Sequence, residues 1–385
     1  METRKLYYEN CHQKTFSSHV TGCEETGGGF LVTLDATAFY PEGGGQACDL
    51  GTLGSANVLD VRERGDQVVH LCDQALPAGT EVTGTIDYAR RFDLMQQHTG
   101  EHMGSGIIHA RYGYHNVGFH MGADVVTIDF DGMIPPQDLP EIENAVNEAI
   151  WQDLPLHIWY PSPEELPQVG YRTKRALPWP VRIVEVPGID KCACCGVHVA
   201  RTGEVGLVKL FSCVKFHQGV RIEMACGKRA RDYLSRVYEQ NRMVSQIFSA
   251  KILETGDAAK RFSDALAAEK LRCVGLQRQV FQTIAAGYAG QGDVLYFARA
   301  LEPAMVRELA DIIARHCGGT ASVFSGSEES FSFALVTYLD TDLRPLGKAM
   351  TQALGGRGGG KPNFQQGSVK ASEAMIRAFY QTERP

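Results

Sequence analysis

Two pairs of metal-binding side chains, far apart in the sequence, restrict the fold more than any other feature of this chain. His98 and His102 are four residues apart, so on a helix both imidazoles lie on one face. Cys194 and His198 follow about ninety residues later and flank a short turn that contains Gly196. Three nitrogens and one sulfur form a donor set that zinc accepts in a tetrahedral arrangement. The pattern therefore predicts that folding brings the two pairs together around one zinc ion per chain.

The identity of the thiol ligand stays open at this level. Cys192, Cys194 and Cys195 all precede His198, and only Cys194 has the four-residue offset, so the other two remain alternatives. Each pair alone also has an ordinary interpretation, because a helical His pair is often a polar surface feature and Cys is often a small buried apolar residue. The two pairs together favour a metal site.

The first part of the chain has the pattern of a small β-barrel. Up to about Ile86, short runs such as residues 30–34 and 67–71 alternate apolar and polar side chains and are separated by Gly, Asp and Pro. Asp87 is then predicted to cap the helix that carries the first His pair. Asp138 is predicted to cap a second helix with an apolar stripe. Strand-like runs follow at residues 181–186, 206–211 and 220–224, which predicts an α/β sandwich.

The remaining sequence is helical at first and then mixed. Residues 228–287 have a helical pattern with a break at 255–257, which predicts an antiparallel helical hairpin. The last hundred residues alternate strands with helices, so the chain as a whole is predicted to be an α+β multidomain protein. The predicted domains are residues 1–87 (β-barrel, translation-factor-like), 88–227 (zinc-containing α/β sandwich), 228–287 (helical hairpin linker) and 288–385 (compact α/β domain).

Composition limits the class of protein. The 385 residues are 44% hydrophobic and 22% charged, which is enough to bury a large core. The sequence has no run of about eighteen apolar residues and no secretory signal pattern, so we expect no membrane partner. Its eleven Cys are spread through a long chain instead of forming a small disulfide framework. We therefore expect a cytoplasmic protein.

Charge and glycine content bear on a nucleic-acid partner. The net charge of −7 argues mildly against one, because phosphate neutralisation usually requires an excess of Lys and Arg. Residues 43–45 and 358–360 are glycine runs, which are either plain turns or backbone that can approach phosphate closely. Gln46 can donate and accept hydrogen bonds, so it could hold a nucleic-acid 3′ end or a water, or fix its own loop. Local basic clusters could follow a phosphate backbone or be solvated surface: Arg172 with Lys174 and Arg175, Lys209 with Lys215, Lys228 with Arg229 and Arg231, and Arg357 with Lys361.

Seven segments, in order along most of the chain, resemble one known family. The two metal motifs and their surroundings resemble the editing domain of alanyl-tRNA synthetase and its free-standing relatives, the AlaX proteins. The C-terminal glycine motif resembles that of the DHHA1 domain that ends alanyl-tRNA synthetases. The synthetase motif Cys-Gly-Gly-Thr-His reads Cys-Cys-Gly-Val-His here, with Cys195 in place of a glycine and Val197 in place of a threonine. The segments are residues 37–46, 49–51, 93–102, 117–121, 194–206, 219–223 and 355–367.

The resemblance implies a function. No aminoacylation core precedes these segments, so we expect a long-form, ATP-independent trans-editing protein. Its activity would be hydrolysis of the ester in tRNA(Ala) that carries a wrong amino acid, chiefly serine and secondly glycine. A homodimer through the helical and C-terminal domains is also expected. The implied site residues are Gln46, His98 and His102 for catalysis; His98, His102, Cys194 and His198 for zinc; and Gly43, Gly44, Gly45, Arg357, Gly359 and Lys361 for nucleic acid.

Two other functions remain as alternatives. The chain could be a non-catalytic tRNA-binding module in which zinc only stabilises the fold. His98-Thr-Gly-Glu-His102 also matches the H-x-x-E-H pattern of inverted zinc peptidases, with Glu101 as general base and a downstream Glu as third ligand. The peptidase interpretation leaves Cys194 and His198 unexplained.

Overall fold

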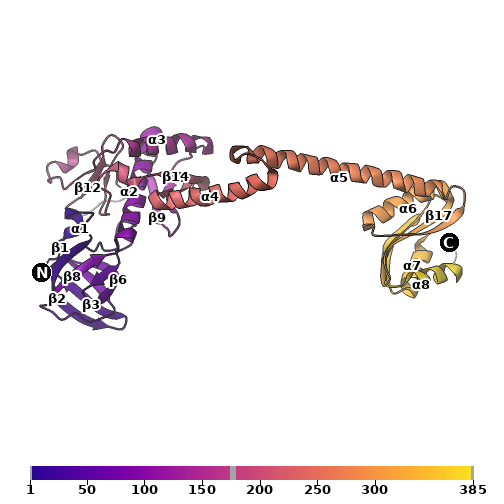
Figure 1. Ribbon diagram of the computed structural model, residues 1–385, viewed down its shortest axis with the longest axis horizontal. Coiled ribbons are helices and arrows are strands. Elements are labelled where there is room, and N and C mark those ends of the chain that lie inside the picture. Colours follow the sequence, from indigo (N-terminus) through magenta and orange to yellow (C-terminus); the bar gives the residue numbers. More distant parts are fainter. Residues whose placement is uncertain (1, 174–178, 383–385) are drawn as a thin grey trace. The chain divides into compact units, whose positions relative to one another are not determined.

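The protein consists of two compact units. The computed structural model describes residues 2–173 and 179–382, and Lys174 and Arg175 of one predicted basic cluster lie outside these ranges. Contacts divide the chain into residues 1–243 and 244–385, and the division falls inside helix α4 (Gly227–Phe248) (Figure 1). The four domain limits predicted from the sequence remain predictions, and the two units are taken one at a time.

The first unit begins with a closed six-stranded barrel in the region where the alternating pattern predicts one. The alternation of side chains explains the barrel wall. Exposed and buried residues alternate along the whole of β8, so Val82, Gly84 and Ile86 point inward. Sixteen buried residues fill the interior. The strands run in the order β2 (Thr15–Thr26), β3 (Gly29–Leu34), β7 (Gln67–Cys72), β6 (Ala56–Arg64), β5 (Gly51–Leu53) and β8 (Glu81–Ile86), with β1 (Arg4–Lys5), helix α1 (Leu6–Glu9) and β4 (Ala36–Thr37) beside it.

Helix α2 (Tyr88–Tyr112) carries the first His pair through the interior of this unit. The Asp87 side chain accepts a hydrogen bond from Arg90 N at 3.1 Å, which confirms the predicted N-cap. The helix ends at Gly113, whose φ of 74° is left-handed. Most side chains from Leu94 to Gly106 are buried, so the metal motif is not a surface feature.

Two sheets and a second helix enclose α2. The four-stranded sheet has the order β14 (Val208–Phe216), β15 (Gly219–Cys226), β10 (Val126–Phe130) and β9 (Asn116–Met121), and the three-stranded sheet has the order β11 (His157–Trp159), β12 (Ile183–Val186) and β13 (Asp190–Ala193). Helix α3 (Leu139–Trp151) buries the predicted apolar stripe. The predicted Asp138 cap is wrong, because its carboxylate accepts from the Tyr112 hydroxyl at 2.6 Å instead of capping α3. Short 3-10 turns occupy Pro136–Asp138, Leu166–Gln168 and Thr202–Val205.

The second unit is a five-stranded sheet with a hydrophobic core on each face. Strands β16 and β17 are parallel and joined through helix α6 (Pro303–Cys317), while the other pairs are antiparallel. Helices α5 and α6 supply one core, and α7 (Arg344–Ala353) and α8 (Glu373–Thr382) supply the other (Figure 1). The sheet order is β16 (Gly292–Ala298), β17 (Gly318–Ser327), β18 (Ser330–Thr337), β20 (Phe364–Val369) and β19 (Arg357–Lys361).

The region predicted to be a helical hairpin is helical. It contains α4, a 3-10 turn at Ile252–Glu254 and the 32-residue helix α5 (Thr255–Ala286). The break spans residues 249–254, directly before the predicted position at 255–257, which lies in the first turn of α5. Antiparallel packing of the two helices stays a prediction.

Candidate metal centre

Folding brings together the four side chains that the spacing selects as ligands. One donor atom from each of His98, His102, Cys194 and His198 lies within 4.8 Å of every other, and all four residues are buried. The two His of α2 face the loop that follows β13. A tetrahedral zinc ion with nitrogen ligands at about 2.0 Å and sulfur at about 2.3 Å needs donors at about this separation.

Two of the three imidazoles have a hydrogen-bond partner at Nδ1, and the third has a carboxylate beside its Nδ1. The Nδ1 atoms lie 2.8 Å from Gln46 Oε1 (His98), 3.1 Å from Asp190 Oδ2 (His102) and 3.2 Å from Thr99 Oγ1 (His198). Two buried ring nitrogens, His198 Nε2 and His102 Nδ1, have no hydrogen-bond partner among the described residues. Such an orphaned nitrogen is costly unless a ligand occupies it. The donor set therefore fits a transition metal bound through three ring nitrogens and one sulfur.

The structure distinguishes the three candidate thiols. Burial raises the pKa of Cys194, but the positive charge of His98 and His102 outweighs burial, and the pKa lies well below its ordinary value. Burial raises the pKa of Cys192 to about 11 and also raises that of Cys195. Metals bind the thiolate form, so Cys194 is the thiol suited to ligation. This agrees with the four-residue offset in the sequence.

The loop that carries Cys194 is held from outside. Arg182 Nη1 donates to Cys194 O at 2.9 Å and to Gly196 O at 2.8 Å, and the Tyr8 hydroxyl donates to Cys195 O at 2.6 Å. A Cβ on Gly196 would lie 2.0 Å from His98 Cε1, so only glycine lets the loop approach the imidazole. The turn glycine of the motif is thus required by the metal centre itself.

Gln46 and the first glycine run connect the barrel to this centre. Gln46 is fully buried, and its Oε1 contacts His98 Nδ1 and accepts from Val197 N at 3.2 Å, while its Nε2 has no partner within the part of the chain that the structure describes. The preceding turn is closed by bonds between Gly43 and Gln46 in both directions, with φ of 59° at Gly44 and 82° at Gly45. Positive φ at both central residues is the geometry of a tight turn that favours glycine. The observed role of Gln46 is therefore to hold His98.

A cavity of about 400 Å³ opens beside the four donors. Gly44, Gly45 and Cys195 line one side, and Phe119, whose ring stacks on His98 at 5.4 Å, lines another. Glu101 also reaches this cavity, and its Oε1 accepts from Ser105 Oγ at 2.6 Å and from Asn116 Nδ2. The arrangement places a small, partly polar space against the metal donors, which can hold a small ligand.

The predicted contacts near the C-terminus lie in the other unit. Arg357, Gly359 and Lys361 are exposed on β19, which is the edge strand of its sheet. A Cβ on Gly360 would lie 2.1 Å from Phe364 O, so part of the glycine content serves close pairing with β20. Gly359 faces open space. These residues are accessible to a partner.

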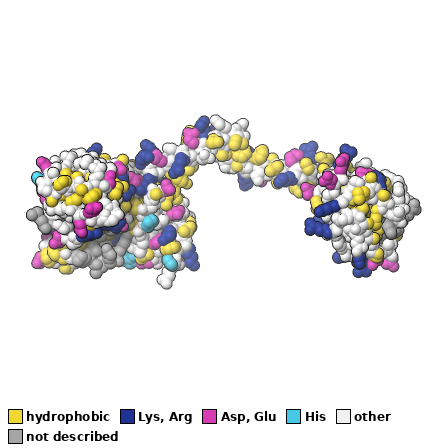
Figure 2. Space-filling model, turned by 90° about the horizontal axis from the view of Figure 1, so that it is seen from below, with side chains coloured by type: hydrophobic (Ala, Val, Ile, Leu, Met, Phe, Trp, Pro, Cys, Tyr) yellow, Lys and Arg dark blue, Asp and Glu magenta, His cyan; other side chains and the backbone are white. Residues whose placement is uncertain are grey.

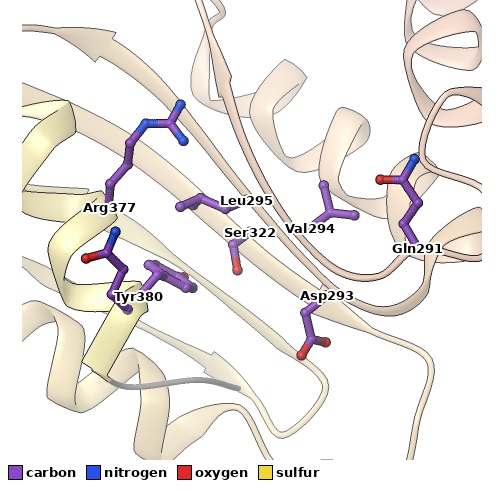
Figure 3. Close-up of a pocket in the computed structure, with 8 residues that line it drawn as sticks. Gln291, Asp293, Val294, Leu295, Ser322, Arg377 and Tyr380 are labelled. Carbon is purple, nitrogen blue, oxygen red and sulfur yellow. The ribbon is translucent and has the colours of Figure 1, made fainter.

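A second cavity, of about 490 Å³, lies in the second unit (Figure 3). Asp293, Val294 and Leu295 of β16 and Arg377 and Tyr380 of α8 line it. Arg377 donates to Glu373 at 2.6 Å and stacks on Phe297, so it is already engaged. Within residues 2–173 and 179–382, the groups suited to a metal lie in the first unit.

Sequence reasoning missed three residues that lie next to the candidate ligands or pair with such a neighbour. Thr99, Asp190 and Arg172 have no motif of their own, because their contacts join positions far apart in the chain. The one available signal is that metal-bound His usually donates its other N–H to a carboxylate or carbonyl, so a nearby Asp was to be expected.

No helix in the described part of the chain is long and apolar enough to cross a membrane.

Comparison with known families now defines the class of protein. Residues 181–238 match the "Threonyl and Alanyl tRNA synthetase second additional domain", and residues 2–90 match the class II (A) tRNA synthetases. The second match covers the barrel, and the first covers the cysteine motif and its flanking strands. These two stretches of the chain are therefore similar to domains of aminoacyl-tRNA synthetases.

Individual relatives narrow this class. The alanine–tRNA ligase of Thermofilum pendens is 32% identical over 99% of this chain, and the chain spans only 44% of that ligase's length. Alanyl-tRNA editing protein Aarsd1 of Danio rerio is 27% identical over 96% of this chain and 94% of its own length, and Aarsd1-B of Xenopus laevis is 27% identical over 96% and 91%. The C-Ala domain of Aquifex aeolicus alanyl-tRNA synthetase is 20% identical over 22% of this chain and 86% of that domain, with a TM-score of 0.20. Over most of its length the chain is similar to alanyl-tRNA editing proteins and to one part of alanine–tRNA ligases.

Proposed function

We propose that this protein is a trans-editing hydrolase that deacylates tRNA(Ala) carrying a wrong amino acid. The observation that carries the proposal is the convergence of His98, His102, Cys194 and His198 beside a cavity of about 400 Å³. The relatives named as editing proteins support the same reaction class. The product is a free amino acid and an uncharged tRNA, formed by attack of water on the ester.

Serine is the proposed main substrate and glycine the second. A synthetase pocket for alanine cannot strongly exclude an analogue that only adds a hydroxyl, whereas a second site that hydrogen-bonds the hydroxyl can reject alanine. The cavity has the size for a small amino acid and has the polar group Glu101 in its wall. An amino acid with a larger side chain needs no second selection, because the alanine pocket of a synthetase can exclude it by size.

We propose zinc as the ion, one per chain, held by the four side chains. With three nitrogens and one sulfur from the protein, zinc would fix the loop and orient the substrate as a positive charge. Gln46 holds His98 and has an Nε2 that can donate to the acyl ester or to water. His98 and His102 act as ligands, because each ring has its Nδ1 engaged by another side chain.

The direct test is a comparison of seryl, glycyl and alanyl forms of tRNA(Ala) with the purified protein. We expect the seryl form to be hydrolysed at least about tenfold faster than the alanyl form, which corresponds to roughly 1.4 kcal/mol of differential transition-state stabilisation. A buried polar partner left unpaired by alanine accounts for a loss of this order. Equal hydrolysis of both esters at limiting enzyme would refute the editing assignment.

The two alternatives predict different results in the same assay. A non-catalytic tRNA-binding protein would bind all three forms and hydrolyse none. A metallopeptidase requires a downstream Glu as third ligand, whereas the third and fourth donors here are Cys194 and His198. Peptide cleavage by the zinc-loaded protein would favour the peptidase.

We further propose that the C-terminal unit is a DHHA1-like domain that supplies tRNA affinity, and that the chain forms a homodimer through α5. Figure 2 shows hydrophobic side chains on the surface of the helical segment, and Phe262, Leu266, Leu276 and Val280 are each about half exposed or more. These positions recur at a helical spacing, so a second α5 could cover them. Light scattering should give twice the mass of one chain, and Leu266→Glu with Val280→Glu should give a monomer.

A further inference from the structure

Asp190 connects a candidate metal ligand to a partly buried arginine, Arg172. Its side chain is 1% exposed, and Oδ2 lies 3.1 Å from His102 Nδ1. Arg172 binds the same carboxylate from the other side, with Nε to Oδ1 at 2.6 Å and Nη2 to Oδ2 at 2.9 Å. Both oxygens of Asp190 are therefore engaged by a planar fork, which fixes the carboxylate plane.

We infer that Asp190 is the positioning residue of the metal centre, orienting His102, and that Arg172 acts through Asp190. The inference rests on the zinc site of the proposed function. It assigns the carboxylate a place outside the coordination shell, where it lies 3.1 Å from Nδ1 and leaves Nε2 for the ion. A carboxylate in this position fixes the ring and raises the basicity of the imidazole.

The chain offers a competing ligand set, His102, Asp190 and Cys192, whose donors also lie within 4.8 Å of one another. In that set Asp190 itself would bind the ion. Arg172 already donates a hydrogen bond to each of the two oxygens that would have to do so. If Asp190 turned away to bind an ion, the partly buried guanidinium of Arg172 would lose its partner, which is costly.

The fold holds the carboxylate against α2 by close backbone approach. A Cβ on Gly106 would lie 2.7 Å from Asp190 Cβ and 2.4 Å from Ile189 O, so only glycine lets β13 pack this close to the helix. Arg172 is fixed along the same strand, since Arg172 N donates to Lys191 O at 2.7 Å and Ala193 N donates to Arg172 O at 3.0 Å. The segment that presents Cys194 thus also presents the partner of His102.

Asp190 is the ionisable partner among the three that hold the imidazoles. His98 contacts the amide of Gln46, and His198 contacts the hydroxyl of Thr99, both neutral groups. A charged acceptor makes a hydrogen bond roughly twice as strong as a neutral one. Asp190 is therefore the one partner of the three that places a full charge beside its ring.

The test is zinc affinity of the full-length protein, measured by competition with a chelator. Removing an outer partner of a zinc-bound His typically costs 10- to 100-fold in affinity, so we expect Asp190→Ala to bind zinc about 10- to 100-fold more weakly and Asp190→Asn to lie between it and the native protein. Asp129→Asn is the matched control, because Asp129 forms the same two-bond pair with Arg221, at 2.7 and 2.8 Å, in the same unit. The control should bind zinc with unchanged affinity.

A cobalt-loaded series separates orientation from ligation. Asp190→Asn and Cys192→Ser should keep the thiolate-to-cobalt charge-transfer band, and Cys194→Ser should lose it. Arg172→Met should weaken zinc binding in the native background and add little in Asp190→Ala, because it acts through Asp190. Arg172→Lys keeps a positive charge that can donate to Asp190, so it should weaken zinc binding less than Arg172→Met. This pair of variants provides the test if Asp190→Asn does not fold.

Native affinity in the Asp190 variants, or in Arg172→Lys and Arg172→Met, would overturn the inference, as would loss of the cobalt band in Cys192→Ser. A native protein that binds no zinc would instead remove the metal centre of the proposed function. The two failures are thus distinguishable.

Discussion

At the scale of single residues, the metal centre depends on side chains that do different tasks at short range. The ligand candidates supply donor atoms, Gln46 and Thr99 orient two imidazoles, and Gly196 provides space for the His98 ring. Changes at these positions should therefore affect metal content in different ways.

Loss of a ligand should remove the ion. His102→Ala and Cys194→Ala each delete one of four donors, so we expect the purified variants to lose most of the roughly one zinc per chain of the native protein. Metal analysis by plasma mass spectrometry measures this directly. Full retention of zinc by both variants would contradict the site, and Cys23→Ala, a change at an exposed thiol, is the control.

Gly196→Ala tests the space requirement without changing any donor. A methyl group 2.0 Å from His98 Cε1 must displace either the ring or the loop, so the zinc content should fall while all four ligands remain. Gly170→Ala, at a position with open space, should have no effect. Normal zinc content in Gly196→Ala would show that the loop can move away at little cost.

At the scale of elements, the barrel contains a titratable group that the site does not use. His70 of β7 is fully buried, with Nε2 2.9 Å from Thr37 Oγ1 and Nδ1 3.1 Å from Val32 O. Burial lowers its pKa from the ordinary value of 6.5 to about 4, and the bond to Val32 opposes this only in part. The imidazole is therefore neutral in the folded barrel at neutral pH.

The consequence is acid sensitivity of the first unit. Below about pH 6.5 the unfolded chain takes up a proton at His70 while the folded barrel does not, so stability falls as the pH is lowered towards 4. The full difference is up to about 3 kcal/mol. Urea unfolding at several pH values should show a smaller loss for His70→Gln than for the native protein, with the exposed His120→Gln as control. Identical pH dependence for native protein and His70→Gln would refute this.

The glycine turn at residues 43–45 meets two structural requirements. Its positive φ values satisfy the turn, and its bare backbone leaves room for two neighbouring side chains. A methyl group on Gly44 would lie 2.9 Å from Cys195 Sγ, and one on Gly45 would lie 2.6 Å from the Phe119 ring. Side chains there would close the cavity. The proposed contact of this turn with the tRNA end is compatible with its position at the cavity wall.

At the scale of the whole molecule, two units divide the proposed tasks. The first contains the metal donors and their cavity, and the second contains an exposed basic, glycine-rich edge strand. The overall charge of −7 means that attraction for tRNA must come from local groups. Arg357 and Lys361 are the proposed groups.

Their contribution should appear in the salt dependence of binding. Arg357→Ala with Lys361→Ala removes two cations, so the slope of log affinity against log salt should become shallower by about 1 to 2. Hydrolysis at saturating tRNA should change little. Arg344→Ala is the control, since Arg344 already pairs with Asp342 at 2.7 Å. An unchanged slope in the double variant would place the tRNA contact elsewhere.

Much of the architecture follows from local sequence patterns. Alternation of apolar and polar residues marks barrel strands, Asp87 marks the start of α2, and the spacing of His98 and His102 places both imidazoles on one helix face. These features depend on residues near one another in the chain, and so the sequence alone determines them. The Asp138 cap failed because a hydroxyl from another helix competes for the same carboxylate.

Only the tertiary structure decided the remaining features of the site. The packing of a barrel turn, a helix and a strand against one another decides three features of the site. It selects the thiol that faces the imidazoles, places Gln46 against His98, and brings Asp190 to both His102 and Arg172. The contact between Gly196 and His98 is of the same kind. No pattern of spacing encodes such distances, because they are set by the packing of segments as much as about 150 residues apart, as between Gln46 and Val197.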